Sequence, residues 1–215
     1  MFFCHKLIMR PFFKVILGGD YYLNPSIKSK TPYIIVANHS SHVDTLAILS
    51  SLPSHNIHKL KPVAAKDYFA RSFIVKYCSK LFINVLLIDR KDPNSRELTI
   101  QSMIRSLKEG NNLLIFPEGT RLNDPTIQPF KSGILAVLKA CPDVPYIPAY
   151  VESTAKILPK GEAMVVPHNF KLLFGKAFYL NEKISDSENL ELMRTQVVKL
   201  QEAAPLISSS TFLKE

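Results

Sequence analysis

Short apolar runs alternate along this chain with stretches in which apolar residues recur every three or four positions. The short runs are rich in β-branched and aromatic residues and predict buried strands, whereas the wider spacing predicts amphipathic helices. Because strands alternate with helices, we expect an α/β fold: a single domain with a mixed, largely parallel central sheet flanked by helices. The predicted strands cover residues 31–38, 82–88, 112–116, 144–151 and 170–180, and the predicted helices cover 45–52, 94–110, 130–140 and 189–204.

The first twenty residues are apolar but contain basic side chains at intervals of four. Lys6, Arg10 and Lys14 would line one face of a helix. A helix that spans a membrane needs about 20 mainly apolar residues, so this segment fits an amphipathic helix at the membrane surface better. We therefore predict a membrane-anchoring segment over 1–20 and one folded domain over 21–215. The alternative is a terminal helix that docks on the core with its lysines in water. The apolar residues around the basic face are Phe2, Phe3, Leu7, Phe12, Val15 and Ile16.

The composition limits the kinds of molecule that the protein is expected to bind. The chain has 215 residues, 47% of them hydrophobic, which is enough for one sizeable core. Its net charge of +9 favours an anionic partner, namely nucleic acid, a membrane surface or a phosphorylated metabolite. We find no aromatic and basic motif that reads nucleic acid, so we do not expect that partner. The three widely spaced cysteines suggest neither disulfides nor a thiolate zinc site and suit a reducing cytoplasm: Cys4, Cys78 and Cys141.

Titratable and hydroxyl side chains gather in the sequence VANHSSHVDTLAI, between a predicted strand and a predicted helix. Ser41 and Asp44 have the spacing of a capping box, so one interpretation is that Asp44 only caps the helix and His39 only fills a loop. The other is a dyad, in which Asp44 accepts the N–H of the His39 ring and fixes its tautomer. Residues five apart in one helix point about 140° apart, so the dyad requires His39 to precede the helix. Its free nitrogen would then be a general base.

Other catalytic chemistry has weaker support around His39. His42 gives an H-x-x-H spacing, which His55 and His58 repeat, but neither pair has the H-E-x-x-H form and no third ligand is evident. We therefore predict no metal site. Ser40 lies beside the histidine, yet the chain lacks a G-x-S-x-G nucleophile motif, which disfavours a serine hydrolase. The hydroxyl that the base activates would then belong to a substrate.

A second cluster of polar residues lies in the sequence FPEGTR, at the end of the predicted strand 112–116. Ligands of open α/β sheets bind beyond the carboxyl ends of the strands, where Glu118 and Arg121 would lie. The planar guanidinium of Arg121 suits a phosphate group, and Gly119 would let the backbone approach it. Arg90, at the end of another predicted strand, is a second candidate for the same anion. The alternative is an ordinary proline–glycine turn with a surface ion pair.

His39-x4-Asp44, Arg90, FPEGTR and the proline-flanked VPYIP occur in this order over about residues 30–180. In order and spacing they resemble the glycerolipid acyltransferase family, the lysophosphatidic acid acyltransferases. The resemblance implies that His39 deprotonates the acceptor hydroxyl, which attacks an acyl thioester without an acyl-enzyme intermediate, and that Asp44 orients His39. It implies that Pro148 lies near the acyl donor. The acceptor's glycerol phosphate would be held by Arg90, Glu118, Gly119, Thr120 and Arg121.

By this resemblance we expect an enzyme of phospholipid synthesis that acylates a lysophosphatidic-acid-type acceptor. It would need no cofactor beyond its co-substrate, acyl-CoA or acyl-carrier protein. Only 38 residues precede His39, so the basic N-terminus would provide the contact with an anionic membrane. We expect a peripheral or monotopic protein on the cytoplasmic side of the cell membrane. The alternatives are another lysophospholipid or glycerol 3-phosphate as acceptor, or a non-catalytic lipid-binding module.

Overall fold

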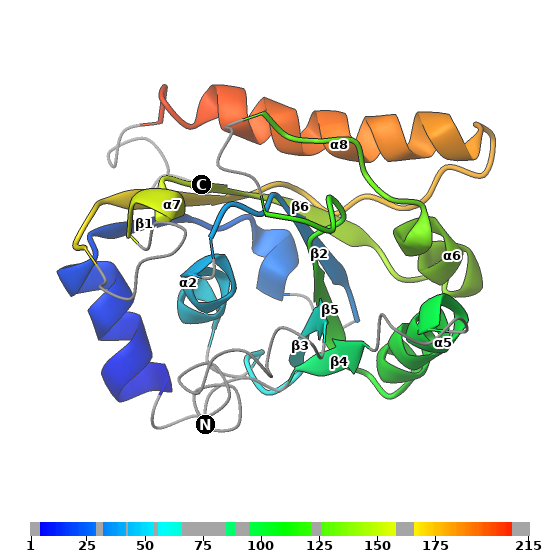
Figure 1. Ribbon diagram of the computed structural model, residues 1–215, viewed down its shortest axis with the longest axis horizontal. Helices are drawn as coiled ribbons and strands as arrows, with labels where there is room; N and C mark the ends of the chain where they lie inside the picture. The colour runs from blue at the N-terminus through cyan, green and yellow to red at the C-terminus, as the bar shows by residue number, and fades with distance from the viewer. Residues whose placement is uncertain are drawn as a thin grey trace.

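Seven strands form one sheet in the computed structural model, in the order β1-β7-β6-β2-β5-β3-β4 (Figure 1). Among the described strands, neighbours are parallel except for the pair β6 and β7. This mixed, largely parallel sheet confirms the predicted α/β fold. The strands are β1 Gly19–Tyr22, β2 Ile34–Ala37, β3 Leu60–Ala65, β4 Leu86–Ile88, β5 Asn112–Ile115, β6 Tyr146–Glu152 and β7 Phe170–Phe174.

Helices flank the sheet on both sides. They are α2 Val43–Ser51, α5 Ser95–Lys108, α6 Gly133–Ala140, α7 Thr154–Ile157 and α8 Asp186–Ala203, with the π-helical turns η1 His5–Met9 and η2 Phe12–Ile16 and the 3₁₀ turn η3 Pro25–Lys28. The structure describes residues 5–28, 32–41, 43–53, 56–65, 85–88, 95–121, 126–157 and 166–207.

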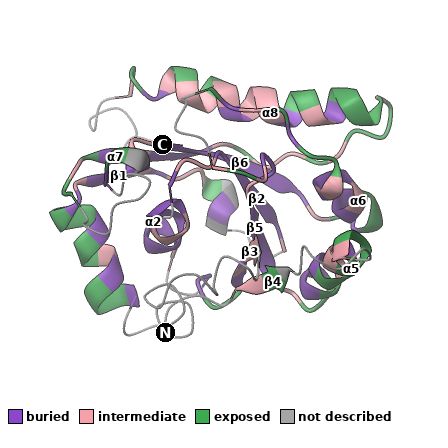
Figure 2. Ribbon diagram, in the orientation of Figure 1, coloured by how far each residue is buried: buried purple, intermediate pink, exposed green. Residues whose placement is uncertain are grey.

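The two faces of the sheet bury separate apolar clusters. Successive strand residues point to opposite faces, so Ile35 of β2 packs with α2 and the N-terminal turns, whereas Ile34 and Val36 pack with α5, α6 and α8. Figure 2 shows the strands buried between these helices. Every residue of β2 is buried. Burial on both faces explains why this strand is a continuous apolar run in the sequence rather than an alternating one.

Most predicted elements are present, with shifted ends. The predicted strand 170–180 was too long, because β7 ends at Phe174, directly before Gly175. The side chain of Pro148 on β6 leaves no room for a Cβ at Gly175. The predicted helix 130–140 begins at Gly133. The sequence patterns did not predict β1, β3 or α7. β1 and β3 contain charged residues or proline, and α7 has only four residues, which is too short for a helical period.

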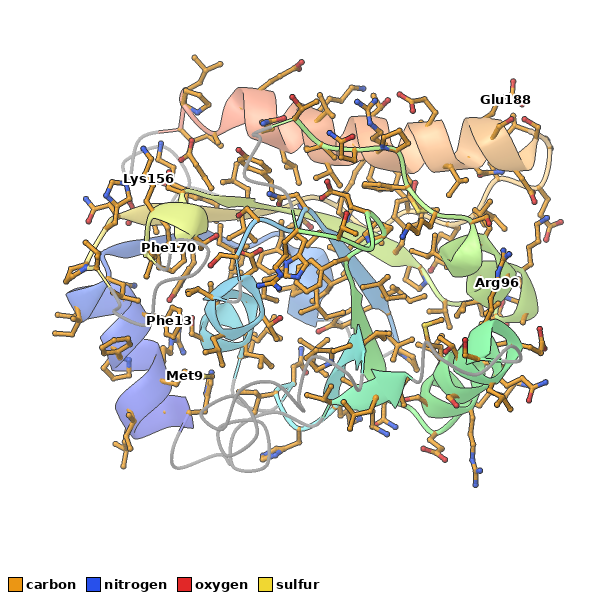
Figure 3. The ribbon with its side chains drawn as sticks, viewed as in Figure 1. Met9, Phe13, Arg96, Lys156, Phe170 and Glu188 are labelled. Carbon is orange, nitrogen blue, oxygen red and sulfur yellow. The ribbon has the colours of Figure 1, made fainter. Side chains whose placement is uncertain are left out.

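The N-terminal turns dock on the core through one side of the helix. Arg10 and Pro11 continue the helix between η1 and η2. Phe13 points toward Phe170 of β7, with ring centroids 6.1 Å apart and an interplanar angle of 90° (Figure 3). His5 Nε2 lies 2.9 Å from the carbonyl oxygen of Leu49 in α2. The buried side chains recur every fourth residue and so share one side of the helix: His5, Met9, Phe13 and Leu17.

Candidate active site

The candidate site lies where three adjacent parallel strands end. β2 has β5 on one side and β6 on the other, so the residues that follow these strands meet at one edge of the sheet. Asn38, directly after β2, donates from Nδ2 to the carbonyl oxygen of Val151 (3.0 Å) and accepts from the Val151 N–H at Oδ1 (2.8 Å). This paired bond fixes the loop after β2 to the end of β6. His39 follows next.

His39 and Asp44 are in contact. His39 lies in the loop and Asp44 in the first turn of α2, with Nδ1 2.9 Å from Oδ2. The main-chain N–H groups of Ser40 and Ser41 also donate to Oδ2, each at 2.8 Å. Because this oxygen accepts from two N–H groups, the ring nitrogen beside it is assigned as a donor as well; in a neutral imidazole the lone pair is then on Nε2. The sequence analysis treated a helix cap and a dyad as alternatives, but Asp44 makes both sets of contacts.

The two side chains of the pair differ in their exposure to solvent. The Asp44 side chain is fully buried, whereas that of His39 is 20% exposed. The ring of His39 stacks on Phe116, with centroids 4.0 Å apart and an interplanar angle of 17°. An imidazole supported in this way keeps its plane while part of the side chain remains exposed to solvent.

Glu118 connects the His39 loop to another segment. Its Oε1 accepts the main-chain N–H of His39 at 2.9 Å, and its Oε2 accepts that of Gln128 at 3.0 Å. Glu118 is 6% exposed, and burial raises the pKa of its carboxyl group, although both main-chain donors act in the opposite direction. These contacts indicate that Glu118 positions the backbone of His39. A contact between Glu118 and the acceptor stays a prediction.

The rest of FPEGTR forms a turn beside the dyad. Gly119 has φ +73°, a conformation that side chains rarely adopt, and the Lys131 side chain lies where a Cβ would project. Thr120 is exposed and Arg121 is half-buried. Burial lowers the pKa of Arg121, and the negative charge of Asp44 raises it. The guanidinium therefore lies within the electrostatic reach of the dyad, as expected for a cation that binds a substrate anion here.

Of the other predicted residues, some lie outside the described part of the chain and one, Pro148, lies inside the sheet. Arg90 lies outside the described residues, so the clamp of two arginines stays a prediction; His42 and His55 lie outside them too. Pro148 pairs with Val36 inside the sheet, four residues before the end of β6, and its carbonyl oxygen accepts the Gly175 N–H at 2.8 Å. Its place near the acyl donor stays a prediction. In the part of the chain that the structure describes, no group of three metal-ligating side chains occurs.

One contact of the dyad was not foreseen. Thr154, which follows β6 and opens α7, donates its hydroxyl hydrogen to Oδ1 of Asp44. Thr154 is 110 residues from Asp44 in the sequence, so no local pattern connects them. The one available signal was a pair of hydroxyl residues, Ser153 and Thr154, at the carboxyl end of a buried strand.

Comparison with known proteins identifies the family. Residues 20–152, more than half of the chain, match the family model described as Acyltransferase. The chain belongs to the glycerolipid acyltransferase family. This acyltransferase is 29% identical over 191 residues to a chloroplast 1-acyl-sn-glycerol-3-phosphate acyltransferase of Brassica napus, an alignment that covers 84% of this chain and 52% of the relative. It is 26% identical over 170 residues to the Bacillus subtilis (strain 168) protein of the same activity name, covering 77% and 78% of the two chains.

The fold of this acyltransferase matches a solved structure. The crystal structure of the 1-acyl-sn-glycerophosphate acyltransferase PlsC of Thermotoga maritima aligns with a TM-score of 0.64 and 22% identity, over 92% of this chain and 81% of that one. The resemblance stated from the motifs is thus confirmed at the level of family and fold. The acyltransferase spans about half the length of the plant chloroplast relatives that it matches.

Proposed function

We propose that this acyltransferase moves a fatty acyl group from a thioester to the free hydroxyl of 1-acyl-glycerol-3-phosphate, with His39 as general base. The observation that carries the proposal is the placement of the His39 ring: Nδ1 lies 2.9 Å from the buried carboxylate of Asp44, and the His39 side chain is 20% exposed. The relatives in Brassica napus and Bacillus subtilis, both named 1-acyl-sn-glycerol-3-phosphate acyltransferases, support this acceptor.

The proposed reaction needs one proton carrier. Nε2 of His39 takes the hydroxyl proton of the acceptor as its oxygen attacks the thioester carbonyl carbon. The carbon–sulfur bond then breaks, and the leaving thiolate takes the proton from the imidazolium. Asp44 stabilises the imidazolium while it exists. A general base of this kind contributes roughly 10²–10⁴-fold, and holding the two substrates together contributes more. The products are the diacyl ester and the free thiol.

A thiol-release assay tests the proposal directly. The full chain is incubated with acyl-CoA or acyl-carrier protein and, in turn, with 1-acyl-glycerol-3-phosphate, glycerol 3-phosphate and a lysophosphatidylcholine. We expect thiol release that depends on 1-acyl-glycerol-3-phosphate and is fastest with it. Equal or faster release with another acceptor would assign the enzyme to that acceptor instead. No release with any pair, from a protein that still binds lipid vesicles, would favour the non-catalytic module.

Arg121 is proposed to bind the acceptor phosphate. Arg121→Ala should raise the KM for 1-acyl-glycerol-3-phosphate roughly 10- to 100-fold with a smaller change in kcat, because a hydrogen bond to a charged group is worth about 1.5–3 kcal/mol. Steady-state kinetics with a monoacylglycerol acceptor provide the comparison, since this acceptor lacks the phosphate. A loss of equal size with both acceptors would contradict a phosphate contact. Arg121→Lys keeps the charge, and its KM for 1-acyl-glycerol-3-phosphate should lie between those of the wild type and Arg121→Ala.

We propose further that the N-terminal segment predicted over 1–20 attaches the enzyme to an anionic membrane through its helical part, peripherally or monotopically, on the cytoplasmic side; its last residues, Gly19 and Asp20, belong to β1. Figure 2 shows that the N-terminal helix is partly buried and partly exposed, and several of its exposed residues are apolar. Lys6 and Lys14 are exposed beside them. No described helix has the length and apolar character needed to cross a bilayer. The exposed apolar side chains and their relative exposures are Leu7 (62%), Ile8 (60%), Val15 (74%) and Ile16 (56%).

Vesicle sedimentation tests this surface. The variant Lys6→Gln/Lys14→Gln should bind phosphatidylglycerol vesicles about 30-fold more weakly than wild type, since each lysine near an anionic surface contributes about 1 kcal/mol. Val15→Ser/Ile16→Ser should weaken binding to any vesicle. Leu206→Ser, which changes an equally exposed apolar residue after α8 (84%), is the matched control and should bind normally. Unchanged binding of both N-terminal variants, or equally tight binding to DNA, would contradict the proposal.

A further inference from the structure

We infer that Thr154 is a positioning residue of the dyad, which fixes the plane of the Asp44 carboxylate and through it the ring of His39. The inference rests on the proposed function, because it assigns Thr154 a role only if His39 is the base. No sequence motif used above includes this residue.

The contacts of Asp44 divide between its two oxygens. Oδ2 accepts from His39, Ser40 and Ser41. Oδ1 accepts the hydroxyl hydrogen of Thr154, which is fully buried. Because a hydroxyl has one hydrogen and Thr154 gives it to Asp44, the 3.2 Å contact with Ser40 Oγ is one in which the Ser40 hydroxyl donates. A continuous path of hydrogen bonds therefore runs from Ser40 through Thr154 and Asp44 to His39.

The backbone before Thr154 is held in an unusual conformation. Ser153, between β6 and α7, has φ +66°, in the left-handed region that non-glycine residues rarely occupy. Its carbonyl oxygen accepts the N–H of Lys156 at 3.0 Å, which closes the first turn of α7. α7 lies against α2, and Ile157 is buried in the same apolar cluster as α2. This packing sustains a conformation that costs energy, and the conformation directs Thr154 to Asp44.

The physical effect expected of Thr154 is on orientation. Rotation about the Cβ–Cγ bond would turn Oδ2 away from the imidazole, and the three N–H groups that donate to Oδ2 oppose this rotation at one end of the carboxylate only. A second bond at Oδ1 blocks the rotation. Hydrogen bonds to an ionised carboxylate are short and strong, so one buried hydroxyl is sufficient for this purpose. Misplacement of a catalytic group by about 1 Å can cost roughly 10²-fold in rate.

The test compares two substitutions of Thr154, one that removes the hydroxyl group and one that keeps it. Thr154→Val keeps the shape and removes the hydroxyl, whereas Thr154→Ser keeps the hydroxyl. In the thiol-release assay we expect Thr154→Val to lower kcat roughly 10- to 100-fold with the KM values of both substrates unchanged. Thr154→Ser should stay within a few-fold of wild type. Ser106→Ala is the matched control, because the buried Ser106 hydroxyl has no hydrogen-bond partner among the described residues; its kcat should not change.

Three outcomes would overturn the inference. They are an unchanged kcat in Thr154→Val, an equal loss in Thr154→Ser, and a loss that appears in KM rather than kcat. Thermal unfolding of each variant identifies a loss caused by misfolding, and rescue by Thr154→Ser separates the hydroxyl's role from packing. His39→Ala is measured in parallel. An active His39→Ala protein refutes the proposed base itself, whereas an inactive one beside a fully active Thr154→Val protein refutes only the role of Thr154.

Discussion

His39→Ala should abolish acyl transfer, with a fall in kcat/KM of at least roughly 10²–10⁴-fold in the thiol-release assay. The alcohol of the acceptor is a poor nucleophile until its proton is removed, and the imidazole is the accessible base at this edge of the sheet. Binding of acceptor and thioester should persist, because the proposed phosphate contact lies on Arg121. The loss is therefore expected in kcat rather than in KM.

The fold should survive the substitution. The His39 ring is partly exposed, and among the described residues it contacts Asp44 through one hydrogen bond and Phe116 by stacking, so its removal leaves the strands and α2 in place. Circular dichroism and thermal unfolding check this. His58→Ala is the matched control, since His58 is exposed and lies outside the proposed dyad. A folded His39→Ala enzyme with near-normal turnover would refute the general-base assignment. Inactivity of His58→Ala would revive the alternative of a histidine metal site.

The contact between His39 and Asp44 was predictable because its determinants are local. His39 and Asp44 are five residues apart, and the apolar runs on either side mark the end of a strand and the start of a helix. This is enough to place the histidine in a loop and the carboxylate in a first helical turn. The ends of elements were less accurate. α8 begins at Asp186, three residues before the predicted Asn189, because Ser185 and Glu188 form a capping box there.

The contacts that support the dyad were not predictable, because they depend on the order of strands in the sheet. Thr154 reaches Asp44, and Glu118 reaches the His39 backbone, only because β6 and β5 lie on either side of β2. Apolar patterns indicate which segments are strands, but not which strand lies beside which. The resemblance assigned Glu118 to the substrate. The structure adds that both of its oxygens accept main-chain N–H groups.

For the N-terminal segment, too, the sequence pattern did not determine what the element contacts. The sequence left two interpretations, a membrane-surface helix and a helix docked on the core. The helix has one side buried against α2 and β7 and another side that is apolar and exposed. Docking on the core is therefore compatible with the proposed membrane contact, since the two use different residues of one helix. A helical period in the sequence indicates that residues share a side, not what that side contacts.

Asp44→Asn should separate catalysis from folding. The amide oxygen of Asn can take the place of Oδ2 and accept from the main-chain N–H groups of Ser40 and Ser41, while its NH₂ group faces Thr154. The Thr154 hydroxyl can then rotate to accept from it, so few buried donors lose a partner. The negative charge is lost, however, and nothing else in the dyad stabilises the imidazolium. We expect kcat to fall roughly 10²–10⁴-fold with only a small change in the free energy of unfolding.

Asp44→Ala provides the contrast. Alanine offers no acceptor, so the N–H groups of Ser40 and Ser41 and the hydroxyl of Thr154 lose their partner, at a cost of about 1–3 kcal/mol for each group that stays buried. We therefore expect Asp44→Ala to lower both kcat and the midpoint of urea unfolding, and Asp44→Asn to lower kcat alone. Normal turnover in Asp44→Asn would show that the charge is not needed, and Asp44 would then be only a helix cap. Equal destabilisation of both variants would mean that the loop after β2 requires a carboxylate to fold.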